Sequence, residues 1–135
     1  MKKILAVAVG AALLGSATAA YAHHSFVAEF DPNKPKTIQG VVKTLEWTNP
    51  HARFYVVVKD DKGGQATWEV ELGSPNTLIR YGWKRSTLNP GDGVTVDGYQ
   101  ARDGHPLINA KTVTLANGKA VAAGSSYKTG ATPGL

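Results

Sequence analysis

The stretch GSPNTLIRYG, residues 73–82, decides the fold of this sequence. Ser74 is a residue type that caps helix N-termini, and Pro75 suits the first helical position because its missing N–H is not needed there. Gly82 is a natural stop, because glycine readily adopts the left-handed conformation that ends a helix. The stretch therefore predicts one short helix over residues 75–81, with its leucine facing the core.

Three segments before this helix alternate between apolar and polar residues, as half-buried antiparallel strands do. They cover residues 39–48, 53–59 and 66–72, and are separated by Asn49-Pro50 and by a glycine-containing hairpin loop at 60–64. Trp68 lies in the third apolar row, so Trp68→Ala is expected to cost roughly 3–5 kcal/mol of stability. The residues expected to face inward are Val41, Leu45, Trp47, Phe54, Val56, Val58, Ala66, Trp68, Val70 and Leu72.

Two further strands are expected after the helix, at residues 93–101 and 107–115, and Asn117-Gly118 predicts a hairpin into a short return strand at 119–122. Three strands, a helix and two strands is the order of elements in an OB-fold. The predicted fold class is therefore mainly β, a small five- to six-stranded OB-fold-like antiparallel barrel with one short helix between strands 3 and 4. An open β-sandwich is the alternative.

Residues 1–22 have the organisation of a secretory signal peptide. Two lysines precede an uncharged apolar run, which closes on the small-x-small sequence Ala20-Tyr21-Ala22. The run is poor in large side chains for a membrane-spanning helix, which needs about 20 strongly apolar residues. We therefore expect cleavage after Ala22, export to the periplasm and no remaining membrane anchor. The expected organisation is an N-terminal arm at 23–38, an OB-like barrel domain at 39–123 and a disordered tail at 124–135.

Composition limits the possible functions of the exported chain. Cleavage of 22 of the 135 residues leaves 113, enough for one domain, and loss of Lys2 and Lys3 lowers the net charge from +5 to +3. This weak, scattered charge does not indicate a nucleic-acid partner. The chain has no cysteine and only the initiator methionine. Disulfides and soft metal ligands are therefore excluded, and a bound metal would need imidazole, amine or oxygen ligands.

The histidines suggest such a metal site. Cleavage after Ala22 would make His23 the N-terminal residue, whose α-amine (pKa about 7.7–8.0) and imidazole can chelate one ion. His51, at the bend after Asn49-Pro50, is the best third ligand, and His24 competes with it or takes a further position. Nitrogen ligands in such a histidine brace favour Cu(II). His105 is expected to be an ordinary surface residue.

Burial of Phe26 and Phe30 against the barrel would hold the arm near His51. Glu69 and Glu71 are two residues apart on the third strand, an ordinary pattern for an exposed strand face. No phosphate loop, nucleophile elbow or zinc-protease helix is present in the sequence, so an enzyme is not predicted. A copper oxidase of the brace type would also need a broad flat substrate face. A 113-residue domain whose tryptophans face inward hardly has such a face, so this function is not favoured.

Two functions of different classes remain. The first is a periplasmic metal-binding protein that carries or buffers Cu(II), with a possible periplasmic protein as its delivery partner. The second is a metal-free β-barrel module that binds a peptide, a glycan or a partner protein.

Six blocks of the sequence carry a family resemblance: HHSF (23–26), AEFD (28–31), EWTNPHA (46–52), ELGSPN (71–76), YGWKR (81–85) and LNPGDGVTVDGY (88–99). On these blocks the chain resembles the small exported bacterial proteins grouped as domain of unknown function 6152. The resemblance covers residues 23 to about 124. It implies an exported β-barrel domain without an assigned activity. His23, His24 and His51 lie inside the blocks, whereas His105 does not.

Overall fold

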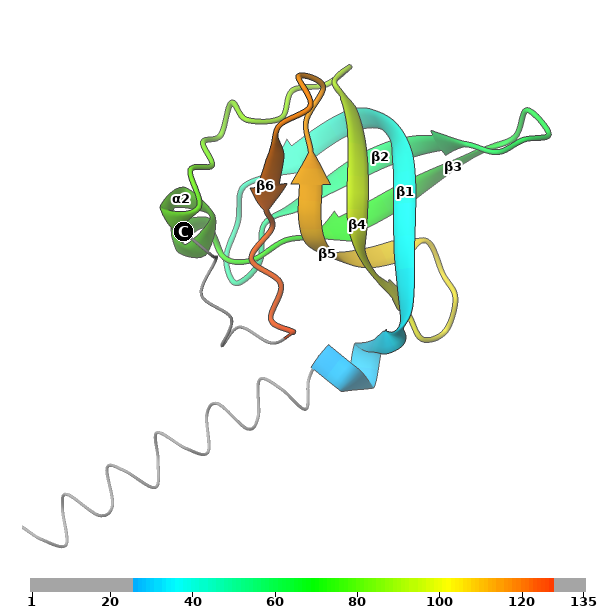
Figure 1. Ribbon diagram of the computed structural model, residues 1–135, viewed down its shortest axis with the longest axis horizontal. Helices are drawn as coiled ribbons and strands as arrows, with labels where there is room; N and C mark the ends of the chain where they lie inside the picture. The colour runs from blue at the N-terminus through cyan, green and yellow to red at the C-terminus, as the bar shows by residue number, and fades with distance from the viewer. Residues whose placement is uncertain (1–25, 128–135) are drawn as a thin grey trace, which may run out of the picture.

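The computed structural model describes residues 26–127 and contains mainly β-strands (Figure 1). A single helical turn at residues 26–29 precedes the first strand. The elements are β1 (Phe30–Glu46), β2 (Arg53–Lys59), β3 (Gln65–Glu71), α2 (Pro75–Arg80), β4 (Gly93–Ala101), β5 (Leu107–Thr114) and β6 (Ala120–Ala122). The predicted order of elements, with a helix between the third and fourth strands, is confirmed.

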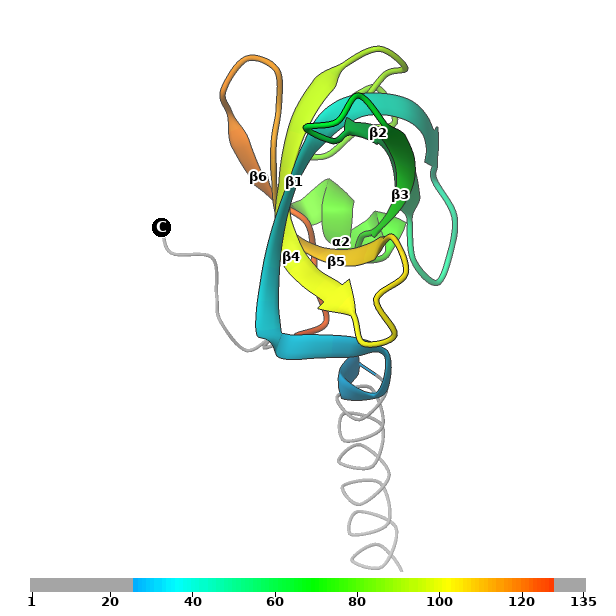
Figure 2. The same cartoon turned by 90° about the vertical axis from the view of Figure 1, so that its right-hand side faces the viewer.

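The six strands form one sheet that closes on itself. Its order is β3-β2-β1-β4-β5-β6, and β3 also pairs with β5, so five strands make a ring with β6 outside it (Figure 2). The OB-fold-like class is confirmed in this ring, and the open β-sandwich is wrong. One detail differs from the antiparallel expectation, because the closing β3–β5 pair is parallel, from Glu69↔Leu107 to Glu71↔Asn109.

The helix α2 forms as its sequence predicts. The Ser74 side chain accepts a hydrogen bond from the Thr77 N–H at 3.3 Å, and Pro75 occupies the first turn. Gly82 follows the helix with a positive φ of 89°, which a side chain would disfavour. Leu78 is completely buried in the main core. Figure 2 looks into the ring and shows α2 behind its opening, so the helix contributes to closing that end.

The first strand departs from the expected alternation at one position. Val41 was expected to face inward but is 47% exposed, whereas Val42 is 2% exposed. The pairing of β1 with β2 shifts between Val42 and Thr44, which marks a β-bulge. A bulge inserts one extra residue and reverses which face the following side chains occupy. Leu45 therefore packs against the core after the bulge, as predicted, while the residue facing inward before it is Val42.

The tryptophans are also distributed differently from the prediction. Trp68, expected in the barrel interior, is only partly buried, and the Lys36 ammonium lies 5.5 Å from its ring centre. Trp83 is 2% exposed instead, and its indole N–H donates to the Ala122 carbonyl at 2.8 Å. Trp68 lies where β3 has no partner strand beyond β2, because β3 meets β5 only from Glu69 onward. The end of the ring therefore leaves one side of this indole accessible.

The expected arm and tail join in a second, smaller core. β1 begins at Phe30, so the second half of the expected arm (23–38) belongs to this strand. Phe26 and Phe30 are buried with Ala101 and Leu107, and the Tyr127 ring stacks on Phe26 at 4.9 Å between ring centres. The expected tail (124–135) is therefore packed against the fold as far as Tyr127. We call this group the arm core.

Residues 1–25 and 128–135 lie outside the described residues, and with them the expected signal peptide and the rest of the expected tail. Within residues 26–127, no helix has the length and apolar character needed to span a membrane.

Candidate functional site

A buried carboxylate lies where β3 ends and the ring closes. Glu71 is 9% exposed, and it is the one charged side chain that is buried among the described residues. Its neighbours Val70 and Leu72 face the main core, so Glu71 points to the outer side of the ring. Its partner across the parallel pair is Asn109, which is 1% exposed. The closing pair of strands therefore places two polar side chains together in a dry environment.

These two side chains are joined by hydrogen bonds to the C-terminal segment. The Asn109 amide donates from Nδ2 to Glu71 Oε1 at 3.0 Å, and the Ser125 hydroxyl donates to Asn109 Oδ1 at 2.5 Å. The Asn109 amide, which is itself held by the Ser125 hydroxyl, orients the carboxylate. A buried carboxylate needs such partners, because removal from water otherwise costs several kcal/mol.

His51 is held beside this carboxylate by backbone pairing. The Ala52 N–H donates to the Gly73 carbonyl at 3.0 Å, and the Leu72 N–H donates to the Ala52 carbonyl at 2.9 Å. The His51 ring nitrogen Nδ1 lies 3.1 Å from the Leu72 carbonyl oxygen. A carbonyl only accepts, so Nδ1 must carry the proton, and in the neutral ring Nε2 keeps a lone pair.

This arrangement is the one that metal-binding histidines commonly have. Their second ring nitrogen usually donates to a carboxylate or a backbone carbonyl, which fixes the tautomer and the ring orientation. We call His51, Glu71, Asn109 and Ser125 the Glu71 cluster.

The electrostatics of Glu71 connect the cluster to the N-terminal arm. Burial raises the pKa of Glu71 above its ordinary value of 4.5, while the charge of His51 and the Asn109 hydrogen bond oppose the rise. Glu29, in the helical turn before β1, raises the pKa further. His51 and Glu29 therefore both lie within electrostatic reach of one carboxylate, although they are 22 residues apart in the sequence.

Packing contacts also connect the Glu71 cluster to the N-terminal arm. Tyr127 stacks on Phe26, and the Tyr127 N–H donates to the Ser125 hydroxyl at 3.2 Å. Ser125 in turn donates to Asn109. The arm core and the Glu71 cluster thus share one continuous set of contacts. The arm is held against the barrel by its two phenylalanines, as the sequence analysis expected.

One of the three predicted ligands lies within the described residues. His51 lies in the Glu71 cluster, whereas His23 and His24 precede the described residues. His105 is exposed in its turn and pairs with Asp103, as expected of a surface residue. Within residues 26–127, no three His, Cys, Asp or Glu side chains come together as a metal site.

The burial of Glu71 differs from the prediction. Glu69 and Glu71 have the spacing of an ordinary exposed pair, but their environments differ. Glu69 forms a surface ion pair with Arg53 at 3.0 Å, whereas Glu71 is covered by Asn109 and the C-terminal segment. The only indication in the sequence was the asparagine in an otherwise apolar stretch of the fifth strand.

Replacing Glu71 by glutamine is expected to stabilise the metal-free protein at neutral pH. Burial raises the pKa of Glu71 in the folded state. The charged form is thus disfavoured, and stability is lost as the pH rises from about 4.5 through the folded pKa. Glutamine keeps an oxygen for Asn109 but carries no charge.

Thermal melts of both proteins between pH 4 and pH 8 test this expectation, each in the presence of a chelator. The melting temperature of Glu71→Gln should exceed that of the parent at pH 8, and the difference should shrink toward pH 4. A difference that grows on acidification would contradict the assigned direction.

Fold and cluster together define a class: a small β protein with a five-stranded ring that carries a buried carboxylate and an oriented histidine at one end. The chain belongs to the family of unknown function DUF6152, whose model matches residues 11–108. That span includes His23, His24, His51 and Glu71. No curated protein and no solved structure matches the chain.

Proposed function

We propose that this protein binds a divalent metal ion, with Cu(II) as the preferred ion, and acts in the periplasm as a carrier or buffer. The ligands are the α-amine and imidazole of His23 and the imidazole of His51, with His24 as a competing or additional ligand. Imidazole and amine nitrogens in a tetragonal arrangement favour Cu(II) over Zn(II). No reaction is proposed for the site.

The observation that carries this proposal is the hydrogen bond from His51 Nδ1 to the Leu72 carbonyl, 3.1 Å long. It leaves Nε2 as the nitrogen available to a metal, on a ring whose charge acts on the buried Glu71 carboxylate. In its ionised form this carboxylate favours a bound divalent cation electrostatically. Asn109 and Ser125 hold that charge in place, which is the role of outer partners in metal sites.

The position of the arm also supports the proposal. His23 precedes Phe26 by three residues, a span of up to about 10 Å in an extended chain. Phe26 is anchored in the arm core, which contacts Ser125 of the Glu71 cluster through Tyr127. An N-terminal His23 would start from this anchored point, so less chain entropy is lost when it binds than for a free terminus.

Copper titration of the protein that begins at His23 tests the function. His51→Ala is expected to weaken Cu(II) binding by about 10- to 100-fold, because it removes one nitrogen ligand. His105→Ala is the matched control, since it removes a histidine from an exposed turn. Competition with a chelator of known affinity gives the dissociation constants.

Equal affinity of the parent and both variants would contradict the proposed site. The metal-free module that binds a peptide, a glycan or a partner protein would then be the better interpretation. A preference for Zn(II) or Ni(II) with the same dependence on His51 would retain the site and correct the metal.

A further inference from the structure

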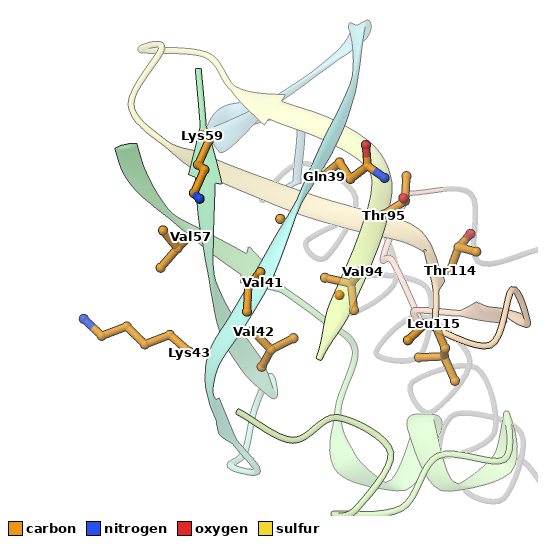
Figure 3. Close-up of a pocket in the computed structure, with 13 residues that line it drawn as sticks. Gln39, Val41, Val42, Lys43, Val57, Lys59, Val94, Thr95, Thr114 and Leu115 are labelled. Atoms are coloured by element: carbon orange, nitrogen blue, oxygen red, sulfur yellow. The ribbon is translucent and has the colours of Figure 1, made fainter. Parts of the chain in front are cut away.

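A groove lies away from the Glu71 cluster, on the part of the ring where β1 passes between β2 and β4. Its volume is about 920 Å³ (Figure 3). Its apolar surface comes from Val41, Val42, Val57, Val94 and Leu115. Val41 is 47% exposed and, with Ile79, is one of two large apolar side chains exposed among the described residues. Val41 directly precedes Val42, where the β-bulge begins, and it lines this groove.

Charge is distributed unevenly around the groove. Lys43 and Lys59 stand on the side of β2, and the threonines Thr95 and Thr114 stand on the opposite side, as Figure 3 shows. No aspartate or glutamate lines the groove. Within residues 26–127, neither lysine forms an ion pair. The groove therefore offers an apolar surface with uncompensated positive charge along one side.

The size of the groove favours a small molecule as its ligand. Its volume lies within the range of about 300–1,000 Å³ that is usual for small-molecule sites. Thirteen residues line it, fewer than the roughly 20–30 residues that each partner contributes to a stable protein interface. A small molecule fits these dimensions better than a folded protein partner.

We propose that this groove binds a small amphiphilic anion, a single acyl chain that ends in a carboxylate. The chain packs on Val41 and Val57, and the carboxylate pairs with Lys43 or Lys59. Each methylene that is buried in the groove adds to the binding affinity, so a chain of medium length suffices for binding. The site is independent of the proposed metal site, because none of its lining residues belongs to the Glu71 cluster.

Titration of the full ¹⁵N-labelled chain with decanoate, followed by amide chemical shifts, tests the proposal. Saturable shifts are expected at Gly40, Gly93 and Thr95, which line the groove. Val41→Glu should weaken decanoate binding by more than 10-fold, because it places a negative charge on the apolar surface. Ile79→Glu is the matched control, since Ile79 is equally apolar, 58% exposed and located on α2 instead.

The role of the lysines is tested with an uncharged ligand of the same length. Lys43→Gln combined with Lys59→Gln should weaken decanoate binding about 10-fold and leave decanol binding unchanged. This double variant changes only exposed side chains, so it remains informative if Val41→Glu fails to fold.

Three results would overturn the proposal. The first is the absence of saturable shifts in the groove, and the second is equal decanoate affinity in the parent and both sets of groove variants. The third is a different occupant. An acidic, leucine-rich decapeptide that binds where decanoate does not would make the groove a peptide site. A dimer in analytical ultracentrifugation that Val41→Glu dissociates would make it a contact between two copies.

Discussion

Acetylation of the His23 α-amine is expected to weaken Cu(II) binding by about 100-fold. Acetylation removes the amine as a ligand and so opens the chelate ring that it forms with the imidazole of His23. It leaves every histidine in place, including His51 with its hydrogen bond to the Leu72 carbonyl. The comparison therefore isolates the terminal amine from the imidazoles.

The measurement is a competition titration of the protein that begins at His23 and of the same protein acetylated only at its α-amine. His105→Ala, which keeps the free α-amine, is the control and should bind Cu(II) like the parent. Equal affinity of all three forms would show that the terminal amine is not a ligand. Loss of binding in His51→Ala alone would then leave a site built on imidazoles.

This prediction depends on the expected cleavage of the chain. Residues 1–22 have the features of a signal peptide, and cleavage after Ala20-Tyr21-Ala22 would make His23 the first residue. N-terminal sequencing of the exported protein is expected to read His-His-Ser-Phe. A protein that retains Tyr21 or begins at Ser25 would remove the basis for a chelate at His23.

Much of the fold follows from local patterns. The cap at Ser74, the proline after it and the glycine at 82 predict α2, because each acts on its own turn of backbone. The alternation of β2 and β4 predicts which side chains are buried, as with Phe54 and Val96. These properties depend on neighbours within a few residues, and the sequence displays them directly.

Features that depend on distant contacts were not predicted. The bulge in β1 changes the alternation between Val42 and Leu45, so that both contact the core, and it is seen in the pairing with β2 rather than in the residues of β1. The closing β3–β5 pair brings together Glu71 and Asn109, which are 38 residues apart. Local sequence patterns do not predict that pairing, so they do not predict the burial of Glu71.

The candidate site also combines a feature that the local sequence predicts with features that depend on distant contacts. His51 was identified because a histidine directly after Asn49-Pro50 is held at a bend, and it lies in the Glu71 cluster. Its tautomer depends on the Leu72 carbonyl, 21 residues further along the chain. His51 is therefore a candidate ligand on its sequence position, and the structure adds the partners that orient its ring.

Trp83→Ala is expected to destabilise the protein by about 3–5 kcal/mol, and Trp68→Ala by less than half of that. The Trp83 indole is 2% exposed and packs in the main core with Leu78 and Leu88. Its removal leaves a large cavity and an unpaired carbonyl at Ala122, the last residue of β6. Trp68 is partly exposed at the end of the ring, where its neighbours lose fewer contacts.

Chemical denaturation of the two variants and the parent gives the free energies of unfolding. Trp83→Phe is a useful third variant, because it keeps most of the buried ring and loses the hydrogen bond to Ala122, for an expected cost of about 1–3 kcal/mol. The free energy of unfolding should rise in the order Trp83→Ala, Trp83→Phe, parent, because burial and hydrogen bonding both stabilise the fold. If Trp68→Ala were as costly as Trp83→Ala, the open end of the ring would have to be covered in solution, and the assignment of Trp83 as the central core tryptophan would be wrong.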